Sequence, residues 1–590
     1  MSKTDKAVCP LPQAMPDVRL MTAILIALAT VCILFALFTL RAFDNNRLTS
    51  WQWVFADKDV FVAGMVLLAG LALTWWFAGM RLSARNALAL LLFSSFAIVV
   101  PLWNEPEVIV DSSRYFSQAK YLAIYGPAYF FREWGLEIRA WTDLPLVPLM
   151  YGFLFKFFGE TRLAVQMMTT LLFSGTILFT YLIGRELWDE LTGLYGGALL
   201  LGMPFLLTQV PLMLVDVPTM FFLTLAVYAT LKAVNPGTLP WLLLCVVTVV
   251  LALLCKYSSW LMLSVLPVIA LAYRPKGRRP LFRRGVFILS GIVFFVAASV
   301  LWKHELITEQ LYLLWDYQWS GLGRWQESHV STFLFQIHPF LSIAAAGSLY
   351  FALRKRNLRY LIIAWMVILV MVLEIKRIRY VLIAFPMLAL MAAYAIRQIT
   401  DARIRHYVVL SIMVSSLTIT FWGHSDFLRN SSAVNIKQAG EYLNTVNAST
   451  VEVIVLPQAR STINPVVSIP LLDLFTRKRL VYLPDPGLIP ALPRRIVETS
   501  SLRFSWDYKV PDYYVRDSVS ADRVIAVITD SDTQALPPAV SERLEGFQMK
   551  RRFVRQEGVF RYTTIVAIYE PVRVSRDNGQ PTEYRGDGNG

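Results

Sequence analysis

Long hydrophobic segments constrain this chain more than any other feature of its sequence. Most are about 16 to 22 residues long, which is enough for a helix to cross about 30 Å of hydrocarbon. Hydrophobic residues make up 56% of the chain and charged residues only 16%, too few to cover the surface of a soluble protein of 590 residues. The sequence therefore predicts a polytopic α-helical membrane protein, embedded in a lipid bilayer, with about 13 spans. These begin near Leu20, Val60, Asn86, Leu163, Leu194, Thr219, Leu239, Tyr257, Val286, Phe333, Tyr360, Tyr380 and Tyr407.

The distribution of basic residues predicts how the spans are oriented. The formal net charge is +15, but the basic residues lie mainly in short loops beside apolar segments, which excludes a nucleic-acid-binding role. Residues 274–284 carry six basic side chains and no acid, so this loop is predicted to be cytoplasmic. Counting spans from there places the N-terminus in the cytoplasm and the chain after Trp422 outside. We expect a multi-pass protein of the cell inner (cytoplasmic) membrane; the endoplasmic reticulum membrane is the alternative.

The same count places two acids and a group of cations together on the outer face. Asp111 and Asp216 each stand alone beside apolar sequence, where a carboxylate is costly unless it meets water, a cation or a substrate. Residues 360–394 are too long for one crossing and are predicted to fold back at Lys376, Arg377 and Arg379. Helix capping by the acids and snorkelling by the cations are the simpler interpretations. A bound anion such as a lipid phosphate explains better why cations lie outside.

The sequence also predicts the organisation around these spans. Residues 111–125 have helical periodicity, and residues 143–158 read as a juxtamembrane helix because two prolines interrupt an apolar run. Residues 436–446 are predicted to form a helix, and residues 451–456, 523–529 and 563–569 strands. We therefore expect N-terminal anchor spans in residues 1–103, a membrane domain with external loops in 104–423, a soluble extracytoplasmic α/β domain in 424–572 and a disordered tail in 573–590.

Six motifs in order resemble those of a known family. The chain has V-D-S-S-R-Y-F-S-Q-A-K around Asp111, L-P-L-x-P-L-x-Y after it, F-G-E-T-R-L-A-V-Q at 158–166 and G-R-E-L-W-D from Gly184. L-V-D-V-P-T-M-F-F surrounds Asp216, and K-R-I-R-Y-V-L-I-A-F-P surrounds Arg377. This order resembles the GT-C glycosyltransferases that use polyprenyl-phosphate sugars, in particular the protein O-mannosyltransferase and lipid A aminoarabinose transferase group. The resemblance covers about residues 111–386.

The resemblance implies an enzyme that transfers a sugar, with inversion, from a polyprenyl-phosphate donor to an extracytoplasmic lipid, glycan or protein acceptor. It makes Asp111 the catalytic base and Asp216 a second active-site acid. Cations must neutralise the phosphate that is left behind. The candidates for binding it are Lys256, Lys376, Arg377, Arg379 and Tyr380.

Several departures from the family pattern leave alternatives open. Ser112 follows Asp111 where relatives often have a second carboxylate, and Thr142-Asp143-Leu144-Pro145 replaces a Lys-Pro-Pro motif. Glu160 and Arg162 are expected to form a local pair. His304 and Glu305 are weak candidate metal ligands, so dependence on a divalent metal stays open and no cofactor is assigned. A transporter or flippase of a lipid-linked saccharide, or a polysaccharide ligase, is the alternative function. A transporter should show repeats and polar residues near mid-membrane, whereas the ionisable residues here lie mostly at span ends, which favours catalysis at the membrane surface.

Overall fold

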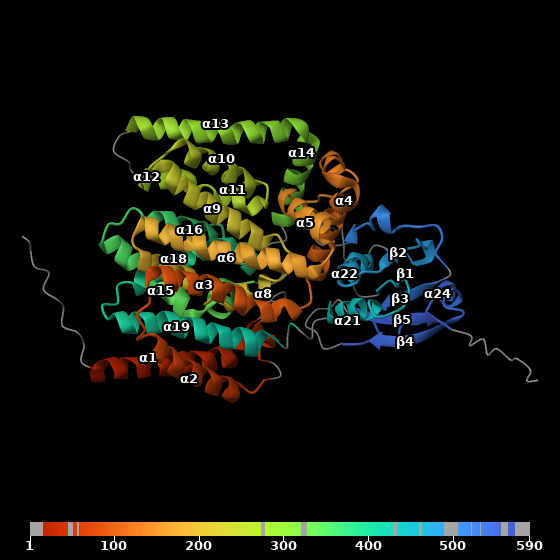
Figure 1. Ribbon diagram of the computed structural model, residues 1–590, viewed down its shortest axis with the longest axis horizontal. Coiled ribbons are helices and arrows are strands. Elements are labelled where there is room, and N and C mark those ends of the chain that lie inside the picture. The colour runs from red at the N-terminus through yellow and green to blue at the C-terminus, as the bar shows by residue number, and fades with distance from the viewer. Residues whose placement is uncertain are drawn as a thin grey trace, which may run out of the picture.

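The protein is a bundle of membrane helices with a smaller α/β domain at one end (Figure 1). The structure, a computed structural model, describes residues 16–44, 51–55, 58–272, 278–319, 327–425, 428, 433–458, 463–488, 506–520, 522–531, 533–555 and 564–572. The predicted tail, residues 573–590, lies outside them.

Eight helical segments within these described residues are long and apolar enough to cross a membrane, so the chain is a multi-pass membrane protein. Two of these segments form the centre of the bundle. In the apolar windows that include α9 and α17–α18, 83% of the residues are buried, whereas none is buried in that of α13. The helices of the eight segments are α1 (Pro16–Leu40), α2 (Val60–Phe77), α3 (Ala84–Val99), α6 (Arg162–Leu187), α9 (Asp216–Val234), α13 (Arg278–Trp302), α17 (Ile378–Val381) with α18 (Phe385–Ile396), and α19 (Ala402–Thr418).

Shorter apolar helices fill the rest of the bundle. Every predicted span start lies in a helical segment, but several of these helices are shorter than a full crossing, so the count of 13 spans stays a prediction. The shorter helices are α7 (Glu190–Leu200), α8 (Pro204–Gln209), α10 (Leu239–Leu253), α11 (Tyr257–Met262), α12 (Val265–Ala272), α15 (Pro339–Arg354) and α16 (Tyr360–Val372).

The chain folds back between α16 and α18, as the sequence predicts. The rings of Tyr360, at the start of α16, and Tyr394, near the end of α18, lie 5.3 Å apart, so the two helices run antiparallel. The turn between them contains Glu374 in a left-handed conformation. Arg377 and Arg379 therefore lie where the chain re-enters the bundle.

Two helices outside the eight long segments, α4 (Ile109–Glu133) and α5 (Leu146–Phe158), lie beside the α/β domain (Figure 1). They pack tightly because Gly152 of α5 lies against α4: a Cβ there would come within 2.7 Å of Leu122 and 2.9 Å of the Ala119 carbonyl oxygen. A helix α14 (His304–Leu313) follows α13. The close packing fixes the orientation of α4, which carries Asp111.

The C-terminal domain contains a five-stranded mixed sheet with strand order β2-β1-β3-β5-β4. Strand β1 is parallel to β2 and β3, whereas β5 is antiparallel to β3 and β4. Three strands match the predicted apolar runs; β2 and β4 were not predicted. The elements are α21 (Ala433–Leu443), β1 (Thr450–Val455), α22 (Ser468–Phe475), β2 (Arg479–Val481), β3 (Arg523–Thr529), α24 (Pro538–Arg543), β4 (Phe547–Phe553) and β5 (Ile565–Pro571).

A buried polar cluster holds this domain against α4. The Lys120 ammonium donates to Asp473 Oδ2 at 2.6 Å and to Glu160 Oε2 at 2.7 Å, and the Tyr514 hydroxyl also donates to Asp473. Asp473, on α22, is 4% exposed. The predicted pairing of Glu160 with Arg162 is wrong, because Glu160, just after α5, pairs with Lys120, and Arg162 pairs with Glu107. The domain is thus attached to the helix that carries Asp111.

Replacing Lys120 with methionine is expected to destabilise the protein by about 3 kcal/mol, because the buried Asp473 carboxylate then loses its cation. Thermal unfolding of the full chain in detergent would measure this loss. Arg132→Met removes a cation of the same helix whose side chain is exposed, and its unfolding midpoint should stay close to that of the wild type. Equal midpoints for both variants would contradict a role for the cluster in docking.

Candidate active site

Two acids that are 105 positions apart in the sequence begin two different helices. Asp111 lies in the first turn of α4, whose N-cap is Val108, so Asp111 is not the capping residue. Asp216 is the first residue of α9, and Val215 is the N-cap without a side-chain capping bond. Helix capping therefore does not explain either carboxylate.

Arg379 joins the two acids. Its Nη1 atom donates to Asp111 Oδ2 at 2.6 Å, while Nη2 and Nε donate to Asp216 Oδ2 at 2.7 and 3.1 Å. The Lys256 ammonium, at the N-cap of α11, donates to Asp216 Oδ1 at 2.6 Å. Two carboxylates and two cations thus form one cluster, which we call the four-charge cluster: Asp111, Asp216, Lys256 and Arg379.

The two acids differ in their access to solvent. The side chain of Asp216 is 1% exposed, whereas that of Asp111 is 25% exposed. Burial by itself raises the pKa of Asp111, but the positive charges of Arg379 and Arg114 outweigh it and hold this pKa well below its usual range. Asp111 is therefore an ionised carboxylate that an incoming molecule can reach, while Asp216 holds the cations in place.

A second ion pair supports Asp111 from its own helix. Arg114 Nη2 lies 2.8 Å from Asp143 Oδ1 and 3.7 Å from Asp111 Oδ1. Gln118 also donates to Asp143. Burial raises the pKa of Asp143, and the Arg114 charge and the Gln118 bond only partly offset this. Arg114 was not predicted from the sequence, although its i,i+3 spacing from Asp111 places both on one helix face.

The buried Glu107 connects the two acid-bearing segments. Its Oε2 accepts from the Met213 amide at 2.9 Å and from the Ser112 hydroxyl at 3.0 Å, and its Oε1 accepts from Arg162 Nε at 2.9 Å. Met213 lies in the turn before Asp216, so Glu107 ties this turn to the start of α4. Arg162 is thus engaged by Glu107, which was not predicted from the sequence.

Of the remaining residues predicted to bind phosphate, some lie beside the four-charge cluster and one lies away from it. The Lys256 ammonium lies 4.6 Å from the centre of the Tyr380 ring, and the Arg377 guanidinium lies 5.2 Å from it. Arg377 also approaches Glu327 at 4.0 Å. The Lys376 side chain instead pairs with the exposed Glu374 at 3.2 Å. The structure therefore brings Lys256, Arg379, Tyr380 and Arg377 together and leaves Lys376 at the surface.

His304 and Glu305 are exposed at the start of α14. Among the described residues, no three His, Cys, Asp or Glu side chains are grouped closely enough to hold a metal ion.

Residues 143–302 match the sequence model of the family described as dolichyl-phosphate-mannose-protein mannosyltransferase. The fold matches ArnT from Cupriavidus metallidurans bound to undecaprenyl phosphate over 82% of this chain and 98% of ArnT, with a TM-score of 0.53 and 13% identity. The resemblance to the GT-C glycosyltransferases is confirmed.

The archaeal oligosaccharyltransferase AglB from Archaeoglobus fulgidus, in complex with an inhibitory peptide and a dolichol-phosphate, matches 61% of this chain and 58% of its own length, with 12% identity and a TM-score of 0.42. No curated protein sequence matches the chain. The matched family segment, residues 143–302, includes Asp216 and Lys256, whereas Asp111 and Arg379 lie outside it.

Proposed function

We propose that the protein is an integral-membrane glycosyltransferase that moves a sugar, with inversion, from a polyprenyl-phosphate donor to an extracytoplasmic lipid, glycan or protein acceptor. The four-charge cluster is the observation that carries this proposal. It combines one solvent-accessible carboxylate with two cations at the end of an apolar bundle. ArnT, which has a similar fold, is bound to undecaprenyl phosphate in its crystal structure.

The accessible carboxylate suits a single displacement. The acceptor hydroxyl oxygen attacks the anomeric carbon of the donor sugar, and the bond from that carbon to the phosphate oxygen breaks. Asp111 accepts the hydroxyl proton as the new glycosidic bond forms. Attack from the face opposite the leaving phosphate inverts the anomeric centre.

The two cations suit the leaving group. Polyprenyl phosphate departs with an additional negative charge, which Arg379 and Lys256 neutralise at the bundle end. Two N–H groups of the planar Arg379 guanidinium already donate to one oxygen of Asp216. The same planar group can make paired hydrogen bonds to two phosphate oxygens. When a donor phosphate attracts Arg379, the hold of Arg379 on Asp111 weakens and Asp111 becomes a stronger base. Donor binding thereby prepares the base.

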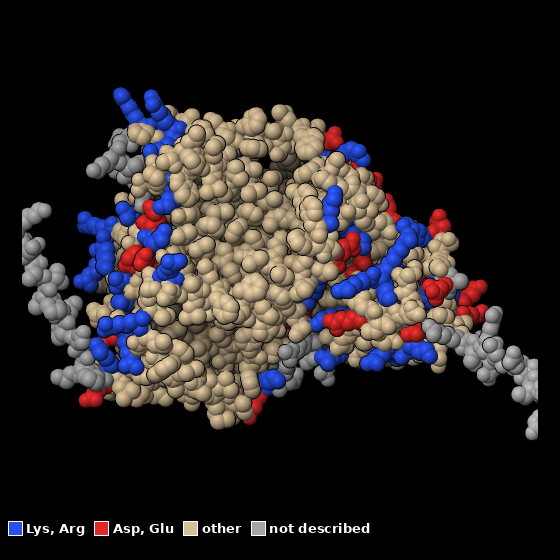
Figure 2. Space-filling view, viewed as in Figure 1, with Lys and Arg blue, Asp and Glu red and all other residues tan. Residues whose placement is uncertain are grey.

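The charge distribution supports an extracytoplasmic site. Lys and Arg side chains gather at the end of the bundle opposite the α/β domain (Figure 2). Since basic loops stay on the cytoplasmic side, the α/β domain and the four-charge cluster would lie on the outer face of the inner membrane. The N-terminus would be cytoplasmic. Residues 1–103 would anchor the catalytic membrane domain of residues 104–423.

Transfer can be tested with purified protein reconstituted in liposomes with a radiolabelled polyprenyl-phosphate sugar and a membrane extract as acceptor source. The expected result is label that moves from the polyprenyl carrier to an acceptor, with release of polyprenyl phosphate. Label that crosses the bilayer while still attached to its carrier, without any transfer, would contradict the proposal and favour a flippase.

Replacing Lys256 with glutamine is expected to reduce transfer by about tenfold to a hundredfold, because Asp216 and the leaving phosphate lose a cation. Lys376→Gln makes the same chemical change four residues before Tyr380, at a side chain outside the cluster. Its effect should be much smaller. Initial rates at saturating donor would compare them, and a larger loss for Lys376→Gln would contradict the assignment of Lys256.

A further inference from the structure

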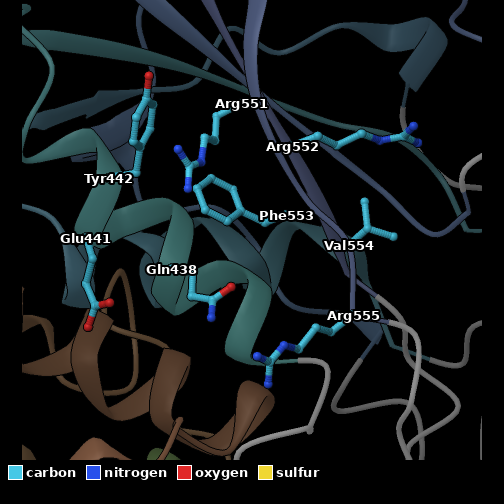
Figure 3. Close-up of a pocket in the computed structure, with 8 residues that line it drawn as sticks. All are labelled: Gln438, Glu441, Tyr442, Arg551, Arg552, Phe553, Val554 and Arg555. Carbon is cyan, nitrogen blue, oxygen red and sulfur yellow. The ribbon is translucent and has the colours of Figure 1, made fainter.

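An open groove lies on the α/β domain, between helix α21 and strand β4, apart from the four-charge cluster. Its volume is about 470 Å³, within the range of small-molecule sites. Figure 3 shows the residues that line it. They are Gln438, Glu441, Tyr442, Arg551, Arg552, Phe553, Val554 and Arg555.

Positive charge dominates the β4 side of this groove. Arg551 and Arg552 are exposed on β4, with Arg555 just beyond its end. In Figure 3 the Arg551 side chain points toward Tyr442, the Arg555 side chain toward Gln438, and the Arg552 side chain away. Lys550 extends the basic run but does not line the groove.

The Arg551 guanidinium is available to a ligand. It lies 5.7 Å from the centre of the Tyr442 ring, and no described carboxylate lies within ion-pair distance of it. The nearby acids are engaged elsewhere: Glu570 accepts from the Tyr442 hydroxyl at 2.9 Å, and Glu441 lies 3.7 Å from Lys437. The groove therefore presents a guanidinium beside an aromatic ring.

Protection of a sheet edge is the simpler explanation of a basic strand. Strand β4 is the last strand of the sheet, and exposed Lys and Arg side chains discourage pairing with another chain. Figure 2 shows basic side chains along this edge of the domain. Edge protection does not require a hollow, nor an arginine directed across it toward an aromatic ring.

We propose that this groove binds an anionic saccharide that carries phosphate or carboxylate groups. Guanidinium groups bind such anions by paired hydrogen bonds, and exposed aromatic rings and amides contact sugar rings. The identification of the ligand as a glycan acceptor rests on the proposed function. The groove would hold an acidic part of the acceptor outside the membrane, away from the reacting hydroxyl.

Equilibrium binding to the full-length protein in nanodiscs of zwitterionic lipid tests the proposal. The probes are a phosphorylated glucose tetrasaccharide, its unphosphorylated parent and inorganic phosphate. Arg551→Gln should weaken binding of the phosphorylated probe by about tenfold, the usual effect of losing a charge-assisted hydrogen bond. Lys550→Gln removes one charge from the same strand outside the groove and should change binding less than about twofold.

Each other outcome would overturn the proposal. Equal weakening by both variants would mean that general surface charge attracts the probe. Inorganic phosphate that binds as tightly as the tetrasaccharide would mean a free-anion site. Capture of phosphatidylglycerol vesicles that depends on Arg551, without tetrasaccharide binding, would assign the groove to membrane lipid. Binding is measured without transfer, so failure of the proposed glycosyltransferase activity would leave a positive binding result intact.

Discussion

Replacing Arg379 with glutamine is expected to lower sugar transfer by about a hundredfold to a thousandfold. The Arg379 side chain binds both acids and, in the proposed reaction, neutralises the leaving phosphate. The substitution leaves Asp216, whose side chain is 1% exposed, with Lys256 as its only cation in the four-charge cluster. Some loss of stability will accompany it, because a buried carboxylate loses a partner. Transfer rates must therefore be normalised to the amount of folded protein, measured by size-exclusion chromatography.

Arg379→Lys separates charge from geometry. Lysine keeps the positive charge but cannot make the three directed bonds to Asp111 and Asp216, so little activity should return. Full activity in Arg379→Lys would show that charge alone suffices and would contradict the bridging role.

The Arg379→Gln variant also has a predicted pH dependence. In the wild type, Arg379 and Arg114 outweigh burial and keep the Asp111 pKa below its usual value. Asp111 is then ionised above that low pKa and loses its charge only when the pH falls through it. Removing Arg379 raises this pKa, so the acid limb of residual transfer should move to higher pH. A pH–rate profile whose acid limb does not move would contradict the coupling.

Much of the membrane fold could be predicted because hydrophobic segments and basic loops are local signals. Every predicted span start lies in a helical segment, and the fold-back before Arg379 follows from the length of one apolar run. The number of crossings is harder to predict. Helices such as α10 and α16 are too short to distinguish a crossing from a partial insertion by sequence alone.

The acids of the candidate site and two of their cations, Lys256 and Arg379, could be singled out from the sequence, but the ion pairs around them could not. The pairing of Arg162 with Glu107, and of Glu160 with Lys120, depends on how α4 packs beside its neighbours. Local spacing instead predicted that Glu160 and Arg162 pair with each other. Long side chains have many rotamers, so their partners are set by tertiary packing. Lys376 was predicted to bind phosphate because it adjoins Arg377 in the sequence, but its side chain pairs with Glu374 at the surface.

Strand β4 was missed for a different physical reason. Its sequence, F-Q-M-K-R-R-F, lacks an apolar run because it lies at the sheet edge with most of its side chains exposed. The apolar pattern that predicts central strands such as β3 is therefore absent. The groove beside β4 was consequently invisible from sequence.

Replacing Asp111 with asparagine is expected to lower transfer by about a hundredfold to ten-thousandfold, the range for loss of a general base. Asparagine has nearly the same size and can still accept a hydrogen bond from Arg379, but it cannot take the acceptor proton. The fold should survive, since the Asp111 side chain is 25% exposed and does not cap α4. The measurement is transfer of radiolabelled sugar from polyprenyl phosphate, with equal amounts of folded protein.

Asp189→Asn is the matched control for the same chemical change. Asp189 is the N-cap of α7, where its side chain accepts from the Thr192 amide, and asparagine caps helices equally well. This control should retain transfer, and both variants should bind polyprenyl phosphate. Donor binding without transfer in Asp111→Asn would assign Asp111 to proton removal, because a residue that only organises the cations would weaken donor binding as well. Unchanged transfer in Asp111→Asn would instead reduce Asp111 to a partner of Arg379 and leave the reaction without this base.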